Sequence, residues 1–417
     1  MKRTSRDIRT ANRYEVLRRC LGRSAVSRQE LAAETGLSSA TVATLVGELL
    51  DLGVLVTDGF VDSGGGRPRG LVSVDAGHGS LVGVDVAETY VHAELFDLNL
   101  RAVARADREP VPGAHGPAHV AAVIADAVRS VLDATTDAGT GGPVLGAGVC
   151  MPGLVDRQGG ISVYAPNWGW RDAVPLRELL AEHLDVPLYL DNPLRASTVA
   201  ELWFGAARGR DDAVVVNLGT GVGAGLALGG ALHRGVTNSA GEWGHTTLVL
   251  DGRPCHCGNR GCVEAYVGAP GIMRSLRELH PRSPLLHPDD QTATIGAIGR
   301  AATEGSAEAL DVVRETARYL GAAIGDLVNL LNPEVVVLSS WVAEALGAPL
   351  LDEVRSAAGR HSLAGPFGAT EIVLSPVPTD PVSLGAATFA LEGFVGRNGV
   401  DTSGLRPGPR ASIAGGA

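Results

Sequence analysis

The sequence predicts an α/β protein that begins with a winged helix-turn-helix domain and continues into a larger body. Three observations support this: two short helical patterns joined by a glycine, a basic glycine-rich hairpin after them, and apolar strand segments such as Glu334–Leu338 further along. The chain has 417 residues, which is too many for one ordinary core. We therefore expect two or three domains, the first at about residues 1–75.

The first 75 residues contain three helical patterns. Arg6–Leu21 places apolar residues roughly on one face, and a second helix opens at Ser27, where Glu30 completes a capping box. This helix stops at Gly36, and a third begins at Ser38. The third carries a stripe at positions i, i+3, i+4, i+7 and i+8, made of Val42, Leu45, Val46, Leu49 and Leu50. Two short helices joined by a tight turn that contains glycine are typical of a helix-turn-helix.

A β-hairpin follows, with predicted strands at Val54–Thr57 and Leu71–Val74 and a basic glycine-rich tip between them. In a winged helix-turn-helix the third helix enters the major groove of DNA, and a basic tip suits phosphate or minor-groove contact. The candidate DNA contacts are Ser38, Ser39, Thr41, Thr44, Arg67 and Arg69. The alternative is a small helical domain that binds another protein.

The charge of the chain is unevenly distributed. Residues 1–75 carry eleven basic and nine acidic side chains, a net charge of +2, so −13 falls on the remainder of a chain whose total is −11. A basic head on an acidic body favours contact with a polyanion, here a double-stranded DNA operator, over a merely solvated basic helix.

Nothing in the sequence predicts export or membrane insertion. The N-terminus lacks the apolar stretch of a signal peptide, so we expect a cytoplasmic protein. The uncharged stretch Ala213–Leu232 is long enough to span a bilayer, but it holds six glycines in a loop-like pattern. We interpret it as strand, turn and strand within a core.

Three of the five cysteines, Cys255, Cys257 and Cys262, lie within eight residues. In a cytosolic chain this clustering favours a metal over disulfides, and structural zinc takes four thiolate or imidazole ligands. The fourth ligand is then His245 or His256. We choose His245, because a ring between two ligand positions on a short turn should point away. The alternative is three reduced core cysteines.

From about Leu81 to Leu391 the chain resembles the ROK family of repressors, open reading frames and sugar kinases. The resemblance rests on Gly241-Glu242-Trp243-Gly244-His245 followed by the cysteine motif that ends at Glu264, on the glycine loop Leu218–Gly225, and on Pro166-Asn167. With the N-terminal domain, the chain is similar to the regulator branch that includes xylose and N-acetylglucosamine repressors. The resemblance implies two actin-like lobes, at 80–190 and 191–395, before a disordered tail at 396–417.

The resemblance also implies a sugar site next to the structural Zn²⁺. Its residues would be Asn167, Asn192, Glu242, His245 and Glu264. Carboxylates and amides supply the fixed donors and acceptors that sugar hydroxyls need. The ring of His245 would join the two sites, with one nitrogen on the metal and the other free for a hydroxyl group.

Three departures from the family's kinases indicate that phosphoryl transfer is lost. The position of the catalytic base is Pro193, which cannot accept a proton, and Asp191 could replace it only if the loop shifted. The first phosphate loop has become Asp85–Tyr90, without its two glycines and its lysine. The glycine pair of the adenosine side has become Ser339-Ser340, followed by Trp341.

Together these observations predict a sugar-responsive DNA-binding transcription regulator rather than an enzyme. Its expected partners are an operator, a small sugar effector and further copies of itself in a homodimer or tetramer. One alternative is an ATP-dependent sugar kinase that carries a DNA-binding domain. Another is a regulator controlled by a protein partner, with a vestigial sugar pocket.

Overall fold

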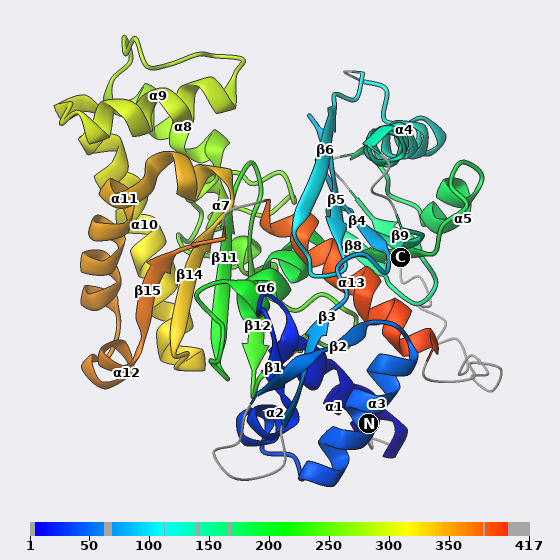
Figure 1. The fold of residues 1–417 in the computed structure, drawn as a ribbon. Helices are drawn as coiled ribbons and strands as arrows, with labels where there is room; N and C mark the ends of the chain where they lie inside the picture. The colour runs from blue at the N-terminus through cyan, green and yellow to red at the C-terminus, as the bar shows by residue number, and fades with distance from the viewer. Residues whose placement is uncertain are drawn as a thin grey trace.

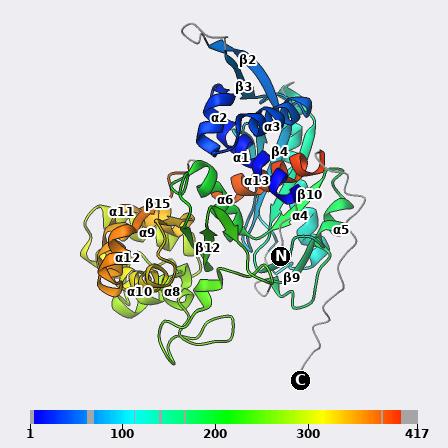
Figure 2. The same ribbon diagram turned by 90° about the horizontal axis from the view of Figure 1, so that it is seen from below.

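The computed structural model describes residues 5–61, 69–111, 113–138, 142–165, 168–377 and 380–398. Two of the predicted site residues, Arg67 and Asn167, lie outside the described residues, as does most of the predicted tail. Within the described part, Figure 1 shows a small N-terminal domain below two larger α/β lobes. The view in Figure 2 shows the N-terminal domain against the first lobe, away from most of the second.

The N-terminal domain has the predicted order of helices and hairpin. Its elements are α1 (Ser5–Cys20), β1 (Val26–Ser27), α2 (Arg28–Thr35), α3 (Ser39–Asp51), β2 (Leu55–Val61) and β3 (Arg69–Val74). The capping box between Ser27 and Glu30 is present, and Gly36 ends α2 in the left-handed conformation. The hairpin strands are longer than predicted, and β3 lies between β1 and β2 in a three-stranded sheet.

The stripe on α3 forms the core of this domain. Val42, Leu45, Val46 and Leu49 are buried, and the fifth predicted member, Leu50, is half-buried. They pack with Leu17 and Leu31 from the other two helices. Burial of each such side chain contributes about 1.5–3 kcal/mol relative to exposure. The segment therefore has the three helices and the β-hairpin that a winged helix-turn-helix requires.

The first lobe is built on a five-stranded sheet in the order β10-β7-β4-β5-β6. Its strands are β4 (Ser80–Val86), β5 (Val91–Asp97), β6 (Ala102–Arg108), β7 (Val144–Cys150) and β10 (Leu188–Asp191), with a separate hairpin of β8 (Leu154–Asp156) and β9 (Ile161–Tyr164). Helix α4 (Pro117–Ala138) covers one face of this sheet, near β5 and β6, and also contacts α5 (Leu176–Ala181).

The second lobe is built on a sheet in the order β13-β12-β11-β14-β15. The strands are β11 (Ala213–Leu218), β12 (Val222–Leu228), β13 (Ala231–His233), β14 (Val335–Ser339) and β15 (Glu371–Leu374). The first three confirm the strand-turn-strand interpretation of 213–232. The helices are α7 (Glu264–Val267), α8 (Ala269–Leu279), α9 (Gln291–Thr303), α10 (Ala307–Leu331), α11 (Trp341–His361) and α12 (Ala364–Ala369), with a 3₁₀ turn, η2 (Glu242–His245).

The last helix, α13 (Pro381–Asn398), corrects two sequence predictions. It packs on β4 and β7 of the first sheet and on α6 (Pro193–Phe204) rather than within the second lobe. The close approach requires glycine: a Cβ atom on Gly83 or Gly148 would lie 1.8–1.9 Å from a carbonyl oxygen of α13. The span 191–395 is therefore not one lobe. The helix also extends to Asn398, past the predicted start of the tail at residue 396.

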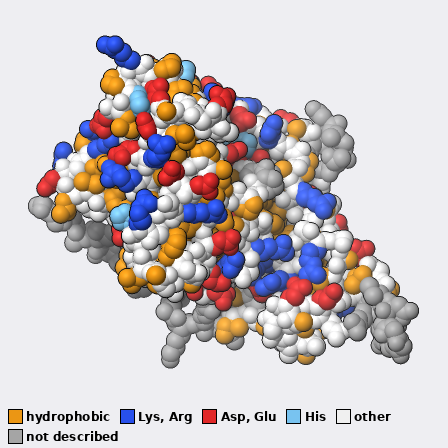
Figure 3. Space-filling model, turned by 90° about the vertical axis from the view of Figure 1, so that its left-hand side faces the viewer, with side chains coloured by type: hydrophobic (Ala, Val, Ile, Leu, Met, Phe, Trp, Pro, Cys, Tyr) orange, Lys and Arg blue, Asp and Glu red, His pale blue; other side chains and the backbone are white. Residues whose placement is uncertain are grey.

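Two further observations concern the charges on the surface and the length and polarity of the helices. On the side of the second lobe drawn in Figure 3, acidic, basic and hydrophobic side chains are interspersed, so this view shows no large patch of one sign. None of the helices among the described residues combines the length and the apolar character needed to cross a bilayer.

Candidate metal and effector site

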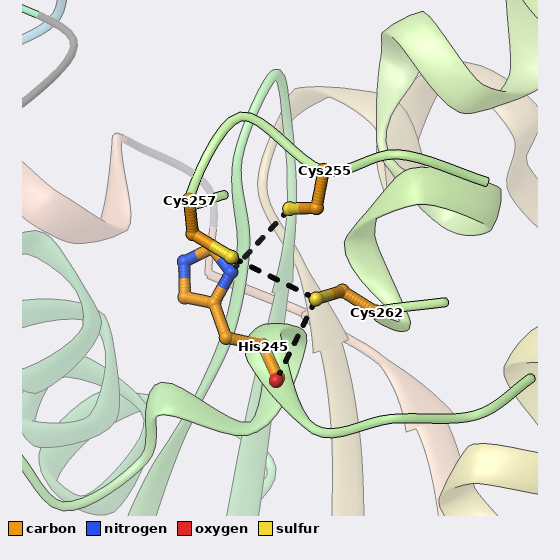
Figure 4. A group of neighbouring side chains, drawn as sticks. All are labelled: His245, Cys255, Cys257 and Cys262. Atoms are coloured by element: carbon orange, nitrogen blue, oxygen red, sulfur yellow. Dashed lines mark hydrogen bonds between the residues drawn. The ribbon is translucent and has the colours of Figure 1, made fainter. Parts of the chain in front are cut away.

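The cysteine loop brings four potential metal ligands together. Figure 4 shows the three cysteine side chains and the ring of His245 converging on one point, between η2 and the loop that precedes α7. The ligand atoms of His245, Cys255, Cys257 and Cys262 all lie within 4.8 Å of one another. Gly261 permits this fold of the loop, because its φ is +77° and a Cβ atom there would lie 1.7 Å from the carbonyl oxygen of Val249.

The distances between these atoms fit tetrahedral zinc. Zn–S distances of about 2.3 Å and a Zn–N distance of about 2.0–2.1 Å place two sulfurs about 3.8 Å apart and a sulfur and a nitrogen about 3.6 Å apart. The sulfurs of Cys257 and Cys262 are 3.8 Å apart, and the Cys255 sulfur lies 3.7 Å from Nδ1 of His245. The donor set is thus suited to a closed structural site with His245 as the fourth ligand.

His256 is not among the four ligands of this cluster, and it has a partner that the sequence did not reveal. Its Nδ1 atom lies 3.0 Å from Oε1 of Glu264. The other carboxylate oxygen of Glu264 accepts a hydrogen bond of 2.9 Å from the backbone amide of Val222. Burial raises the pKa of Glu264, but the bonds from His256 and Val222 outweigh it and hold that pKa below its ordinary value. Glu264 is therefore a buried carboxylate.

Glu242 stands on the same 3₁₀ turn as His245. The turn lies against β12, and Gly241 allows this because a Cβ atom there would lie 1.8 Å from the carbonyl oxygen of Ala224. Burial raises the pKa of Glu242, and the nearby charges of His245 and Arg195 lower it in part. Three of the predicted sugar residues, Glu242, His245 and Glu264, thus form one cluster.

Asn192 has a structural role in addition to its predicted one. Its side-chain oxygen caps α6 by accepting a hydrogen bond of 2.8 Å from the amide of Leu194, and its Nδ2 atom donates to the carbonyl oxygen of Gly153 at 2.7 Å. Each of the two side-chain atoms keeps one hydrogen-bonding position for a ligand. Pro193 occupies the first turn of α6, where a missing amide hydrogen is tolerated.

Asp191 is held by arginines. Only 1% of its side chain is exposed, and it pairs with Arg234 at 2.7 Å and with Arg157 and Arg195 at 3.8 Å each. These ion pairs fix the position of the Asp191 carboxylate beside Pro193. The arginines were not anticipated, since their positions in the sequence show no common pattern.

The altered phosphate loop is closed by its own side chains. The hydroxyl group of Tyr90 donates a hydrogen bond of 2.8 Å to Asp85, and the amide of Ala87 donates to the carbonyl oxygen of Tyr90 at 2.8 Å. On the other lobe, Ser340 adopts φ 77° and ψ 170°, a conformation that favours glycine. Ser340 thus keeps a backbone conformation typical of glycine, whereas no residue of the loop Asp85–Tyr90 has a positive φ.

The predicted DNA contacts of α3 lie on the surface. Ser38, Ser39 and Thr44 are exposed and Thr41 is half-buried. Ser38 caps the helix by accepting from the amide of Thr41 at 3.1 Å, and its hydroxyl group also lies 2.8 Å from that of Thr41. Arg69 begins β3, and its backbone pairs with Val61 at the end of the hairpin strands next to the tip.

A cysteine loop suited to zinc lies next to clustered carboxylates in a two-lobed α/β fold, and this combination defines the class of protein. The chain belongs to the ROK family. The family profile matches residues 81–392. The predicted membership and the predicted fold are both confirmed.

Relatives of two kinds are similar to the chain. The xylose repressor of Caldicellulosiruptor bescii is 28% identical over 388 residues, which cover 92% of this chain and 96% of the repressor. The glucokinase of Thermotoga maritima is 31% identical over 317 residues, which cover 75% of this chain and 97% of the kinase. A solved ROK family transcriptional regulator, a homologue of the E. coli MLC protein, has a TM-score of 0.74 at 23% identity and covers 93% of this chain and 98% of its own.

Proposed function

We propose that the protein is a sugar-responsive DNA-binding transcription regulator, a repressor of carbohydrate-utilisation genes. Its kinase chemistry is lost. The observation that carries the proposal is the contact between the helix-turn-helix domain and α13, the helix that also reaches the arginines around Asp191. Similarity to repressors over almost the whole chain, including the N-terminal domain, supports it. The similarity to the glucokinase covers 75% of the chain.

The contact between the two parts is specific and polar. The hydroxyl group of Tyr14 on α1 donates a hydrogen bond to the carbonyl oxygen of Glu392 on α13. Arg13 donates to the carbonyl oxygen of Val395 at 3.2 Å, and its guanidinium also lies 2.6 Å from the carboxylate of Glu48 on α3. Arg13 is 3% exposed, so this contact is buried.

Side chains of the same helix also contact arginines near Asn192, one of the predicted sugar residues. The carboxylate of Glu392 lies 3.6 Å from Arg157, and Arg157 lies 3.8 Å from Asp191, which precedes Asn192. The guanidinium groups of Arg157 and Arg234 also stand over the ring of Phe389, at 5.4 and 5.6 Å from its centre. A sugar that moves Asn192 would therefore shift groups that contact α13.

The mechanism follows from this connection. A sugar binds through Asn167, Asn192, Glu242, His245 and Glu264, with Zn²⁺ holding the wall formed by His245. The movement passes through α13 to α1 and α3, and it changes the spacing of two winged domains in a homodimer or tetramer. Half-sites about one helical turn apart would no longer be read together. A coupling free energy of about 1–3 kcal/mol corresponds to a change of about 5–150-fold in operator affinity.

The experiment measures binding of the purified protein to DNA from upstream of its own gene, titrated with pentoses, hexoses and amino sugars. We expect one sugar to change the affinity, and Glu242→Ala to abolish that response without changing affinity in the absence of sugar. Glu304→Ala, at an exposed position on the same lobe, is the matched control. A Glu242→Ala protein that responds like the wild type would exclude this pocket.

The alternative function is an ATP-dependent sugar kinase with an appended DNA-binding domain. Pro193 at the position of the base, the ion pairs of Asp191 and the closed loop Asp85–Tyr90 all weigh against it. It requires sugar-dependent consumption of ATP. Detecting that activity in the purified protein would replace the proposal by the kinase.

A further inference from the structure

A cavity of about 770 Å³ lies between the lobes, beside the altered phosphate loop. Its first-lobe wall includes Asp85 at the end of β4, Glu94 on β5 and Asp380 at the start of α13. Its second-lobe wall includes Ser339 and Trp341, at the junction of β14 and α11. Small-molecule sites commonly enclose about 300–1,000 Å³, so the cavity has the size of such a site.

The first-lobe wall gathers carboxyl groups from three separate elements. Asp85 and Glu94 are 5% and 6% exposed, and Asp380 caps α13 by accepting a hydrogen bond of 2.6 Å from the amide of Ser383. Burial and the nearby charge of Asp380 raise the pKa of Asp85 to about 8. Two carboxyl groups that disfavour each other's ionisation would both be stabilised by a positive charge between them.

Two residues of the cavity lining each have a buried polar atom that lacks a protein partner among the described residues. Oε2 of Glu94 and the hydroxyl oxygen of Ser339 accept or donate no hydrogen bond within the described structure, although Ser339 is only 1% exposed. The other carboxylate oxygen of Glu94 lies 3.3 Å from His92. Because a buried polar group without a partner costs about 1–3 kcal/mol, a ligand that reached these two side chains would relieve that cost.

The basic groups of the cavity leave part of this negative charge uncompensated. His92 is shared between Glu94 and Asp107, at 3.3 and 2.6 Å. Arg105 stands opposite Glu94 in the strand pair, but it is exposed. Glu344, also in the lining, is exposed at the start of α11. A triphosphate would face the carboxyl groups of Glu94, Asp380 and Glu344 here, so the wall disfavours such a polyanion.

The same wall favours an organic cation over a metal ion. Among the described residues, groups of three metal-type ligands within 4.8 Å occur only around the cysteine loop, so the carboxyl groups of the cavity are too dispersed for one ion. The half-buried Trp341 supplies an aromatic ring on the opposite wall, and indole rings attract organic cations.

We propose that this cavity binds a small organic cation, a molecule that carries a primary ammonium or amidinium group, between Asp85, Glu94, Asp380 and Trp341. Its charged group takes the unpartnered oxygens of Glu94 and Ser339, and its carbon chain lies against Trp341. The site is separate from the sugar residues, and its occupancy does not depend on the proposed sugar response.

The test is calorimetric titration of the full-length protein with putrescine and with agmatine at constant ionic strength. The uncharged 1,4-butanediol serves as the isosteric control. We expect one saturable site per chain for at least one of the two cations and at least about tenfold weaker binding of the diol, since a charge-assisted hydrogen bond contributes about 1.5–3 kcal/mol. Neither sugar nor DNA is present, so the result is independent of the regulator proposal.

Variants distinguish binding of the cation at this site from its general electrostatic attraction to an acidic protein. Glu94→Gln and Asp380→Asn should each weaken the cation at least about tenfold, whereas Glu371→Gln on the exposed end of β15 should leave binding unchanged. Glu344→Gln and Trp341→Leu change residues that are exposed or half-buried, so they serve if a buried variant melts early. Absence of saturable binding, equal binding of the diol, or binding unaffected by all four cavity variants would overturn the proposal.

Discussion

The guanidinium group of Arg13 on α1 lies 2.6 Å from the carboxylate of Glu48 on α3 while it donates a hydrogen bond to the carbonyl oxygen of Val395 on α13. One buried side chain thus connects α3 of the N-terminal domain to α13, the last helix of the chain's described part. Glu48 is also paired with Arg9, whose side chain is 59% exposed. The two arginines therefore share a partner but differ in burial, which makes them a matched pair for experiment.

Replacing Arg13 by Gln should destabilise the protein by about 3 kcal/mol, because it leaves the carbonyl oxygen of Val395 without its donor and the partly buried carboxylate of Glu48 with Arg9 alone. Arg9→Gln should cost less than about 1 kcal/mol, as an exposed ion pair does. Chemical denaturation gives both values. In DNA titrations, Arg13→Gln should reduce the sugar response more than Arg9→Gln. Equal losses of stability would show that Arg13 is not the residue that joins the parts.

The two histidines near the cysteine loop should differ in their effect on zinc. His245→Asn removes the nitrogen that lies 3.7 Å from the sulfur of Cys255, so we expect loss of the metal after dialysis against a mild chelator. His256→Asn removes a partner of Glu264 and should leave one zinc ion per chain. Elemental analysis of the two variants decides between them. Retention of zinc by His245→Asn alone would assign the fourth ligand to His256.

Ser340→Gly should stabilise the protein by about 1 kcal/mol. Its φ of 77° with ψ of 170° costs a serine about 1–3 kcal/mol, and the greater freedom of glycine in the unfolded chain offsets part of the gain. Ser340→Ala keeps the Cβ atom and should give no gain. The midpoint of denaturant unfolding measures both variants. A serine-to-glycine change that lowers the midpoint would mean that the hydroxyl group of Ser340 contributes more than the backbone costs.

The stability of the wild type should fall as the pH rises, in part through Asp85. Burial and Asp380 raise the pKa of Asp85 from 3.8 to about 8. The folded state therefore binds a proton that the unfolded chain has released, and this contribution is complete below pH 3.8 and lost as the pH passes about 8. Asp85→Asn cannot titrate but can still accept from Tyr90. Its unfolding midpoint should change less between pH 5 and 9, and a parallel profile would contradict the assignment.

Much of the fold could be predicted because its signals are local. The stripe on α3, the cap at Ser27 and the cysteine spacing each specify short segments, and all three are present in the structure. The extent of the two lobes could not be predicted in the same way. Nothing in the sequence of α13 says which sheet it will pack on, because its apolar residues would suit either sheet.

The candidate site was predictable only as far as the family motif reached. Glu242, His245 and Glu264 come together as expected, since they belong to one contiguous signature. The partners that determine their charge, His256 for Glu264 and Arg195 for Glu242, were missed. Pairing of charges between distant segments depends on the packing of α6 and the loops, and periodicity carries no information about it.

The hydrogen bond between Tyr14 and Glu392 joins residues that are 378 positions apart in the chain. A ribosome that adds about 5–20 residues per second needs about 20–75 seconds to make the segment between them. During that time the N-terminal domain can fold but has no α13 to rest on. A chain that is cut short before α13 would leave this domain untethered and outside the control of any ligand, so a premature stop late in the gene should uncouple DNA binding from regulation.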